Sequence, residues 1–158
     1  MRRLVEIMQP GAPYTFAEIV ELCQASECFD VLVGELGGEI KNANRVTLAN
    51  DPTAHAEMVA IREACHKLGA FQLTACDVYS SCEPCPMCLG ALYWARPARV
   101  IFAATRSDAA AAGFDDELVY EQLALPYAGR SLPMVRIETP RAAAPFEAWQ
   151  AKPDRTKY

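Results

Sequence analysis

Two short stretches of the sequence hold residues that could bind a metal and move protons. The first, DPTAHAE (51–57), holds His55, one of two histidines in the chain, two places before Glu57. The second, SCEPCPMC (81–88), holds three of the seven cysteines in the spacing Cys-x-x-Cys-x-x-Cys. Histidine nitrogens and cysteine thiolates are common zinc ligands, and cysteines three apart can reach one ion from a single helical turn. The sequence therefore predicts a metal site built from two segments.

The predicted ligands are His55, Cys85 and Cys88, which leave a fourth zinc position open for water. Zinc lowers the pKa of such a water to about 7, so a nearby general base is needed, and Glu57 is the candidate. Residues two apart on a regular helix point to nearly opposite sides, so we expect His55 at the very start of its helix. The pattern His-x-Glu followed by Pro-Cys-x-x-Cys is typical of zinc nucleobase deaminases.

Two other metal sites fit part of the same pattern. A closed structural zinc could use His55 with Cys82, Cys85 and Cys88, which would make the protein a binding module and leave Glu57 without a role. An iron–sulfur run would need a further cysteine where the sequence has Leu92. X-ray absorption distinguishes the two zinc hypotheses, because the catalytic site has two sulfur ligands and the structural site has three.

The elements that must position these residues alternate between helices and strands. A capping box marks the start of the helix predicted over 15–27. Hydrophobic periodicity, together with glycine and proline breaks, marks the bounds of the other helices and strands. We expect helices over 15–27, 51–69, 85–95, 115–125 and 144–151, and strands over 29–35, 39–46, 76–81, 98–104 and 133–138. Such alternation predicts an α/β fold with a largely covered mixed sheet. Two helix N-termini, each following a strand, would then converge on the metal.

The composition limits the class of protein and its partners. A chain of 158 residues suits one domain, and no apolar run is long enough to span a bilayer. The apolar stretch near the N-terminus is too short for a signal peptide. The cysteines are odd in number and unevenly spread along the chain, which does not fit a disulfide framework, so we expect a cytoplasmic protein. A net charge of −5 without a basic cluster disfavours nucleic acid as a partner and favours a small neutral molecule.

Four segments carry a resemblance to a known family. DPTAHAE, SSCEPCPMCLGALYWARP, AAGFDDELVY and the tail PFEAWQ…KY resemble the bacterial guanine deaminases of the cytidine and deoxycytidylate deaminase family, from about Asn44 onward. The resemblance implies a cytidine-deaminase-like three-layer α/β/α fold with a central mixed five-stranded sheet, as a single domain over 1–158. It also implies hydrolysis of guanine to xanthine and ammonia, one zinc ion per subunit, and a homodimer whose C-terminal segment, 140–158, is exchanged between subunits.

The resemblance also implies roles for particular residues beyond the metal ligands. Asn44 and Asp116 would hydrogen-bond the purine, Trp94 would form part of the pocket wall, and Tyr158 would arrive from the partner subunit. The family usually has a Gly-Gly-Pro-Phe-Gly-Ala run at the start of its first strand, whereas this chain reads SECFDVLVG. Phe29 alone remains of that run, as the candidate for stacking on the base.

The exact substrate stays open at this level. Related enzymes of this fold act on cytosine, on nucleosides or on adenosine in tRNA, and the acidic net charge argues against tRNA. Guanosine, cytosine, cytidine or another aminated heterocycle remain alternatives to guanine. Ammonia release from a panel of bases and nucleosides would distinguish them.

Overall fold

The computed structural model describes most of the chain, with side chains from Asn44 onward. The described residues are 4–8, 33–35, 38–40, 42–114 and 116–157. The contacts of the chain form two compact units, residues 1–119 and 120–158. The helix predicted over 15–27 lies outside the described residues, as do Phe29 and Tyr158. A single domain over the whole chain stays a prediction.

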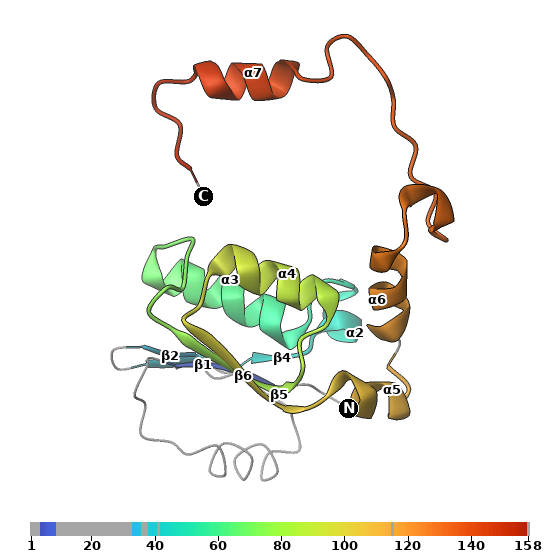
Figure 1. The fold of residues 1–158 in the computed structure, drawn as a ribbon. Helices are drawn as coiled ribbons and strands as arrows, with labels where there is room; N and C mark the ends of the chain where they lie inside the picture. Colours follow the sequence, from blue (N-terminus) through green and yellow to red (C-terminus); the bar gives the residue numbers. More distant parts are fainter. Residues whose placement is uncertain (1–3, 9–32, 36–37, 41, 115, 158) are drawn as a thin grey trace. The chain divides into compact units, whose positions relative to one another are not determined.

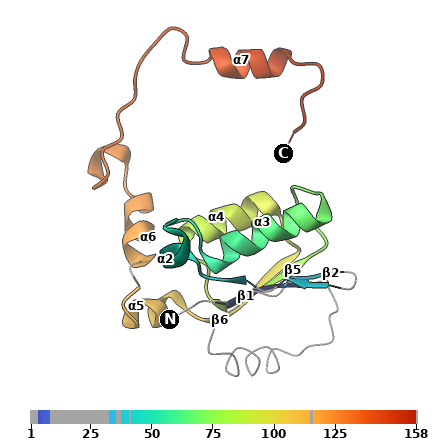
Figure 2. The same ribbon diagram turned by 180° about the vertical axis from the view of Figure 1, so that it is seen from behind.

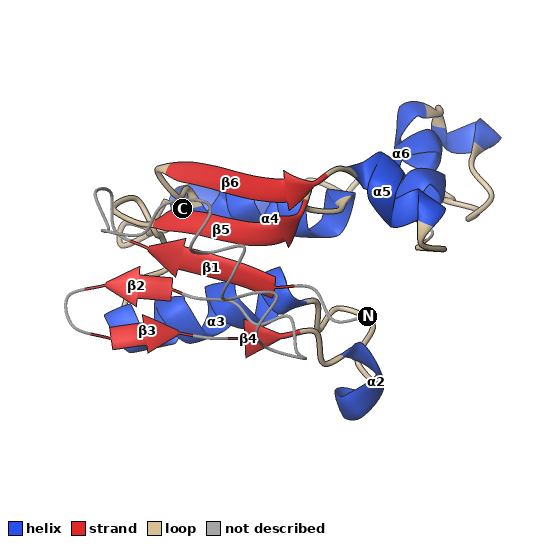
Figure 3. Cartoon of the chain, turned by 90° about the horizontal axis from the view of Figure 1, so that it is seen from below, coloured by secondary structure: helices blue, strands red, loops and turns tan. Residues whose placement is uncertain are grey.

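The first unit is built on a mixed sheet in the order β3-β2-β1-β5-β6, with β4 paired to β1 (Figure 3). Strands β5 and β6 are parallel, whereas β1 runs antiparallel to β5. The strands are β1 (Leu4–Met8), β2 (Val33–Glu35), β3 (Gly38–Ile40), β4 (Asn42–Ala43), β5 (Asp77–Cys82) and β6 (Arg99–Ala104). The predicted mixed sheet is confirmed. The predicted count of five strands is not, because the described residues contribute six.

The strands differ from the predictions in three places. The strand predicted over 39–46 appears as β3 and β4, and α2 begins at Val46. Strand β1 was not predicted, although it lies between β2 and β5 in the sheet. Its five residues, LVEIM, give too short an apolar pattern to distinguish a strand from a helix. The strand predicted over 133–138 is wrong, because these residues have no regular secondary structure. Their composition suits a strand, but a strand also needs a ladder partner, and the described part of this chain supplies none.

Helices α3 (Ala56–Leu68) and α4 (Pro86–Ala95) lie side by side on the same face of the sheet (Figures 1 and 2). Both follow the predicted segments closely, but α3 begins at Ala56 rather than near Asp51. The three-layer arrangement stays a prediction. The remaining helices of this unit are α2 (Val46–Ala49), α5 (Arg106–Ala111) and α6 (Asp116–Ala124), the last of which continues into the second unit.

The core lies where α3 and α4 meet the sheet. Helix α3 contributes only alanines to the fully buried cluster, and these short side chains allow its backbone to approach its neighbours closely. The cluster comprises Ala56, Ala60, Ala64, Leu73, Cys76, Val78, Leu92 and Ala95. The larger side chains of Ile61, Cys65 and Leu68 are only partly buried and pack against this cluster. Close packing against the neighbouring elements therefore selects small side chains on the buried face of this helix.

The second unit holds short elements with local contacts. It contains a 3₁₀ turn, η1 (Tyr127–Gly129), and α7 (Ala144–Ala151), which coincides with the helix predicted over 144–151. The Arg130 guanidinium donates to the Leu125 carbonyl at 3.0 Å and lies 4.8 Å from the centre of the Tyr127 ring. Among the described helices of both units, none has the length and hydrophobicity needed to cross a membrane.

Candidate metal centre

The three predicted ligands meet at the N-terminal ends of α3 and α4. The Nδ1 atom of His55 lies 3.6 Å from the Sγ atom of Cys85 and 3.6 Å from that of Cys88. All three ligand atoms lie within 4.8 Å of one another. Among the described residues, this is the group of histidine, cysteine and acidic side chains that could hold a metal ion.

The local backbone explains why these side chains converge. His55 is the N-cap of α3 and has an extended conformation, with φ −62° and ψ 153°. Cys85 is the N-cap of α4, with φ −63° and ψ 166°, and Pro86 follows at the first helical position, where its missing N–H costs nothing. His55 therefore begins its helix, as the predicted metal site required, although the helix itself was predicted to start at Asp51. Both capping side chains lie beside a helix N-terminus. The partial positive charge of that terminus favours thiolates.

The spacing of the three atoms fits zinc. Zinc–sulfur bonds of about 2.3 Å and zinc–nitrogen bonds of about 2.0 Å place the ligand atoms of a tetrahedron roughly 3.5 Å apart. The observed separations of 3.6 Å between nitrogen and sulfur agree with that value. Two sulfurs and one imidazole nitrogen are also a donor set that zinc prefers. The three residues could therefore hold one zinc ion, and they leave one tetrahedral position for another ligand.

The electrostatics of the two cysteines are coupled. The Cys88 side chain donates a hydrogen bond that lowers the pKa of Cys85 to about 4, and His55 acts in the same direction. The pKa of Cys88 is raised, first by that hydrogen bond to Cys85, then by burial, and then by the negative charge of Glu57. Without a cation, the pair thus shares one negative charge. A divalent ion would favour the thiolate form of both cysteines.

Glu57 lies next to the ligands without belonging to their group. Its side chain is completely buried in the first turn of α3, two residues after His55. Both of its carboxylate oxygens are buried, and its negative charge contributes to the raised pKa of Cys88, which places the carboxylate near the cysteine end of the site. A buried carboxylate beside an open metal position is the arrangement that a general base requires.

The third cysteine of the motif points elsewhere. The Cys82 Sγ atom lies 3.7 Å from the Thr105 carbonyl oxygen, to which its thiol donates a weak hydrogen bond. Cys82 is absent from the described group that could hold a metal. The closed structural site that used all three cysteines therefore has no support in this geometry.

Asn44 is held beside the histidine end of the site. The backbone N–H of Arg45 donates to the carbonyl of Ala54 at 2.8 Å, which joins the residue after Asn44 to the residue before His55. The Oδ1 atom of Asn44 accepts from the N–H of Val46 at 3.0 Å. With its oxygen engaged in this way, the half-buried amide can present its NH₂ group to a ligand.

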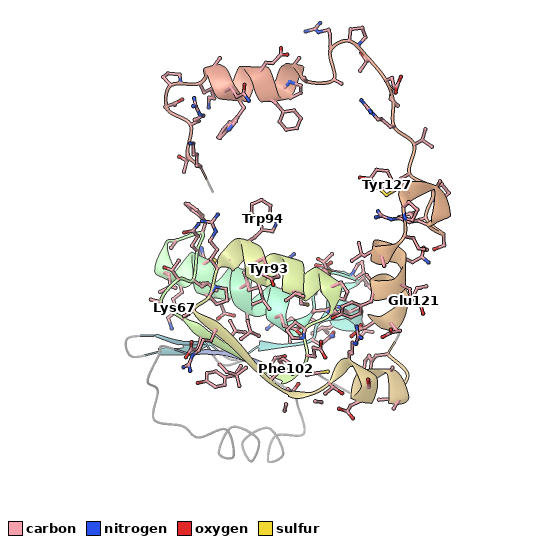
Figure 4. The ribbon with its side chains drawn as sticks, in the orientation of Figure 1. Lys67, Tyr93, Trp94, Phe102, Glu121 and Tyr127 are labelled. Atoms are coloured by element: carbon pink, nitrogen blue, oxygen red, sulfur yellow. The ribbon has the colours of Figure 1, made fainter. Side chains whose placement is uncertain are left out.

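The other predicted substrate residues do not lie in the ligand group. Asp116 is half-buried and is the first residue of α6. Trp94 lies near the end of α4, 64% exposed, and projects from the side of that helix turned away from the sheet (Figure 4). Phe29 and Tyr158 fall outside the described residues, so their roles stay predictions.

The structure also identifies contacts around the site that were not predicted. Thr105 and Asp108 form a capping box at the start of α5, in which each side chain accepts from the other residue's backbone N–H. The Thr-x-x-Asp spacing is a recognisable signal for such a box. Glu83, between Cys82 and Cys85, accepts from the backbone N–H of Arg106 at 2.9 Å. Sequence gives no sign of that contact, because it joins residues 23 positions apart.

Comparison with known proteins gives a consistent result. Residues 17–104 match the family described as the cytidine and deoxycytidylate deaminase zinc-binding region. A guanine deaminase of Bacillus subtilis is 51% identical over 115 residues, which cover 73% of this chain and 74% of that protein. The X-ray structure of a guanine deaminase from the same species superposes with a TM-score of 0.78 at 39% identity, covering 99% of this chain and 83% of the other. A tRNA-specific adenosine deaminase of Aquifex aeolicus is 46% identical over 89 residues, 53% of this chain and 59% of that protein.

Proposed function

The chain belongs to the cytidine and deoxycytidylate deaminase family, and from this membership we propose that it is a zinc-dependent deaminase that hydrolyses guanine to xanthine and ammonia. The family match covers more than half of the chain and includes all three candidate zinc ligands. Similarity to guanine deaminase in both sequence and structure extends well beyond that region and supports guanine as the substrate.

One observation carries the proposal. His55, Cys85 and Cys88 gather around a common point, and the fully buried Glu57 lies beside them without joining the ligand group. A structural zinc would need a fourth protein ligand and no base. Three ligands and a neighbouring carboxylate suit hydrolysis of a carbon–nitrogen bond.

The mechanism follows from the position of Glu57. When bound, zinc lowers the pKa of a coordinated water and so supplies a nucleophile at neutral pH. Glu57 accepts a proton from the attacking water as the water oxygen bonds to C2 of guanine, and it passes this proton to a ring nitrogen. Glu57 then carries the remaining proton of the new C2 hydroxyl to the amino group, which leaves as ammonia while the C2 carbonyl forms. The burial of Glu57 keeps bulk water away from these transfers.

Asn44 and Asp116 are the proposed purine-binding residues. The NH₂ group of Asn44 can donate to a ring or carbonyl acceptor, since its oxygen already accepts from Val46. The Asp116 carboxylate can accept from the N–H groups of guanine. The two residues together would favour a base that has both an acceptor for Asn44 and donors for Asp116 over a base that lacks one of them. Trp94 would add part of the pocket wall.

A substrate panel tests the proposal. Purified zinc-loaded protein is incubated separately with guanine, guanosine, cytosine, cytidine and adenine, and ammonia release is followed. We expect guanine to give the highest kcat/KM. A higher value for a nucleoside or for cytosine would support the alternative, a deaminase of the same fold acting on another substrate. No release from any compound, by protein with a full complement of zinc, would reject the proposed activity.

We also propose that the protein is a homodimer in which residues 140–158 are exchanged between subunits. Two large aromatic side chains of α7, Phe146 and Trp149, are 69% and 41% exposed. Exposed apolar groups of this size are typical of a surface that contacts a partner. The exchanged segment would bring Tyr158 to the purine site of the other subunit, and exchange of an identical element is an easy route to a two-fold dimer.

A further inference from the structure

Glu83 joins the turn that carries Cys85 to the start of α5. Its carboxylate Oε2 atom accepts from the backbone N–H of Arg106 at 2.9 Å. Its own backbone N–H donates to the Ala104 carbonyl at 2.8 Å, which continues the pairing with β6 one residue past the end of β5. One residue, two places before a zinc ligand, thus contacts the β6–α5 junction through both its backbone and its side chain.

The hydrogen bond from Arg106 to Glu83 satisfies a backbone group at the start of α5. The first N–H groups of a helix have no partner within the helix. Here the N–H of Thr105 donates to the Asp108 carboxylate at 2.8 Å, and the N–H of Asp108 donates to the Thr105 hydroxyl at 3.3 Å. The N–H of Arg106 is satisfied by a side chain from another segment, Glu83. The hydrogen bonds at the start of α5 are therefore complete only when the turn that carries Cys85 is in place.

The same helix leads directly to Asp116. After α5 the chain turns at Gly113, whose φ of +86° suits glycine. The turn is tied back to the helix, because the N–H of Phe114 donates to the Ala109 carbonyl at 3.1 Å. The position at which α5 begins therefore influences where Asp116 lies, a short distance further along the chain.

We propose that Glu83 is a positioning residue, which aligns the proposed purine-binding carboxylate of Asp116 with the zinc ligands through its hydrogen bond to Arg106. This inference rests on the proposed function, because it takes Asp116 as a substrate contact. Glu83 contributes no ligand atom to the group that could hold a metal. Its effect on the reaction is transmitted through the backbone of α5.

The first test compares Glu83→Ala with Glu83→Gln. We expect the alanine variant to retain one zinc per chain and to lose roughly 10- to 100-fold in kcat/KM, the effect of losing one hydrogen bond to a charged acceptor. The glutamine oxygen can still accept from Arg106, so this variant should recover most of the activity. Glu63→Ala, on the exposed side of α3, is the matched control and should behave as the wild type. Loss of zinc from Glu83→Ala, or a glutamine variant as impaired as alanine, would overturn the proposal.

A second measurement tests whether the effect passes through Asp116. In an Asp116→Asn background, Glu83→Ala should lower kcat/KM by less than about twofold, because residues that act as one unit are not additive. A full additional loss in the double variant would show that Glu83 acts elsewhere.

Amide hydrogen exchange tests the contact without any reaction. Glu83→Ala should accelerate exchange of the Arg106 amide by about tenfold or more, with smaller increases through the Gly113 turn, whereas Glu83→Gln should not. Unchanged exchange at Arg106 would reject the inference even if the wild-type enzyme deaminates guanine. If the wild type fails to deaminate guanine, the proposed function falls, while exchange still decides the role of Glu83 and kcat/KM is compared on the substrate that the panel identifies.

Discussion

At the scale of single residues, the proposed roles of His55 in metal binding and of Glu57 in proton transfer fall within one helical turn. His55 caps α3 from an extended backbone and turns its ring toward the cysteines, whereas Glu57 lies inside the first turn and is fully buried. The irregular start of the helix allows residues two apart to face the same point. This division predicts that metal binding and proton transfer can be separated by mutation.

Glu57→Gln should abolish most turnover while leaving zinc in place. The amide keeps the shape of the side chain but cannot take a proton from water, so we expect kcat to fall roughly 10²- to 10⁴-fold. Zinc per chain, measured by elemental analysis, should equal that of the wild type. If zinc were lost in step with activity, Glu57 would instead be a ligand or a structural support.

The cysteines should differ in their effect on zinc. Cys85→Ser removes a ligand and should lower zinc content sharply, whereas Cys82→Ser should retain about one zinc per chain because its thiol contacts the Thr105 carbonyl. X-ray absorption of the wild-type protein should report two sulfur neighbours. Three sulfur neighbours, together with zinc loss from Cys82→Ser, would instead support the closed structural zinc site.

Asp116→Asn tests substrate recognition. A carboxylate accepts from guanine N–H groups on both oxygens, whereas an amide accepts on only one, so we expect a loss of about 1–3 kcal/mol in kcat/KM. Zinc content and the unfolding midpoint should stay unchanged. Equal kcat/KM values for the variant and the wild type would leave Asp116 as an ordinary residue at the start of α6.

At the scale of elements, α4 links the core to the metal centre. Its first turn carries Cys85 and Cys88, and its later turns bury Leu92 against the cluster shared with α3 and the sheet. Packing of Leu92 therefore holds the helix whose N-terminus presents two ligands. The stability of this element and the geometry of the site should depend on one another.

Leu92→Ala should destabilise the protein by about 2–5 kcal/mol, because it leaves a cavity in the core. Leu48→Ala makes the same chemical change at a side chain that is 78% exposed and should cost less than about 0.5 kcal/mol. Urea unfolding of the zinc-loaded proteins measures both. Similar losses at the two positions would mean that the α4 core is not the cooperative centre of this unit.

The elements themselves were predictable to different degrees. Helices α4 and α7 and strands β5 and β6 follow the sequence to within a residue or so, since proline, glycine and dense apolar residues delimit them. Helix α3 was predicted to begin at Asp51, but the Asp51 carboxylate accepts from the N–H of Thr53 at 2.8 Å and forms a turn there instead. Strand β1 and the Glu83 contact depend on tertiary pairing, which no local pattern reports.

At the scale of the whole molecule, the two units of the chain differ in how they satisfy their apolar groups. The first has a closed cluster between helices and sheet, whereas none of the described residues of the second is buried, and several of its large apolar side chains are mostly exposed. These are Leu132, Val135, Ile137 and Phe146. A single chain leaves this surface in water, which a second copy could cover. Phe146 lies within residues 140–158 and the other three lie in the stretch that leads to them, so cover by a second copy supports the proposed exchange.

A complementation experiment tests that exchange. One variant carries Glu57→Gln with its tail intact, and the other keeps Glu57 but lacks residues 152–158. Each alone should be nearly inactive. In a mixed dimer with exchanged tails, the first chain's tail completes the site of the second, so one of two sites should work. Random pairing after joint refolding then gives about a quarter of wild-type activity.

The control for this experiment replaces the first variant with one that carries Glu57→Gln and also lacks residues 152–158. No tail is then available, and mixtures should stay inactive. Different affinity tags on the two chains establish that mixed dimers form. Exchange would place residues 152–158 of the Glu57→Gln chain beside Glu57 of the truncated chain. If these mixed dimers form and remain as inactive as their parents, the tail does not complete the partner's site.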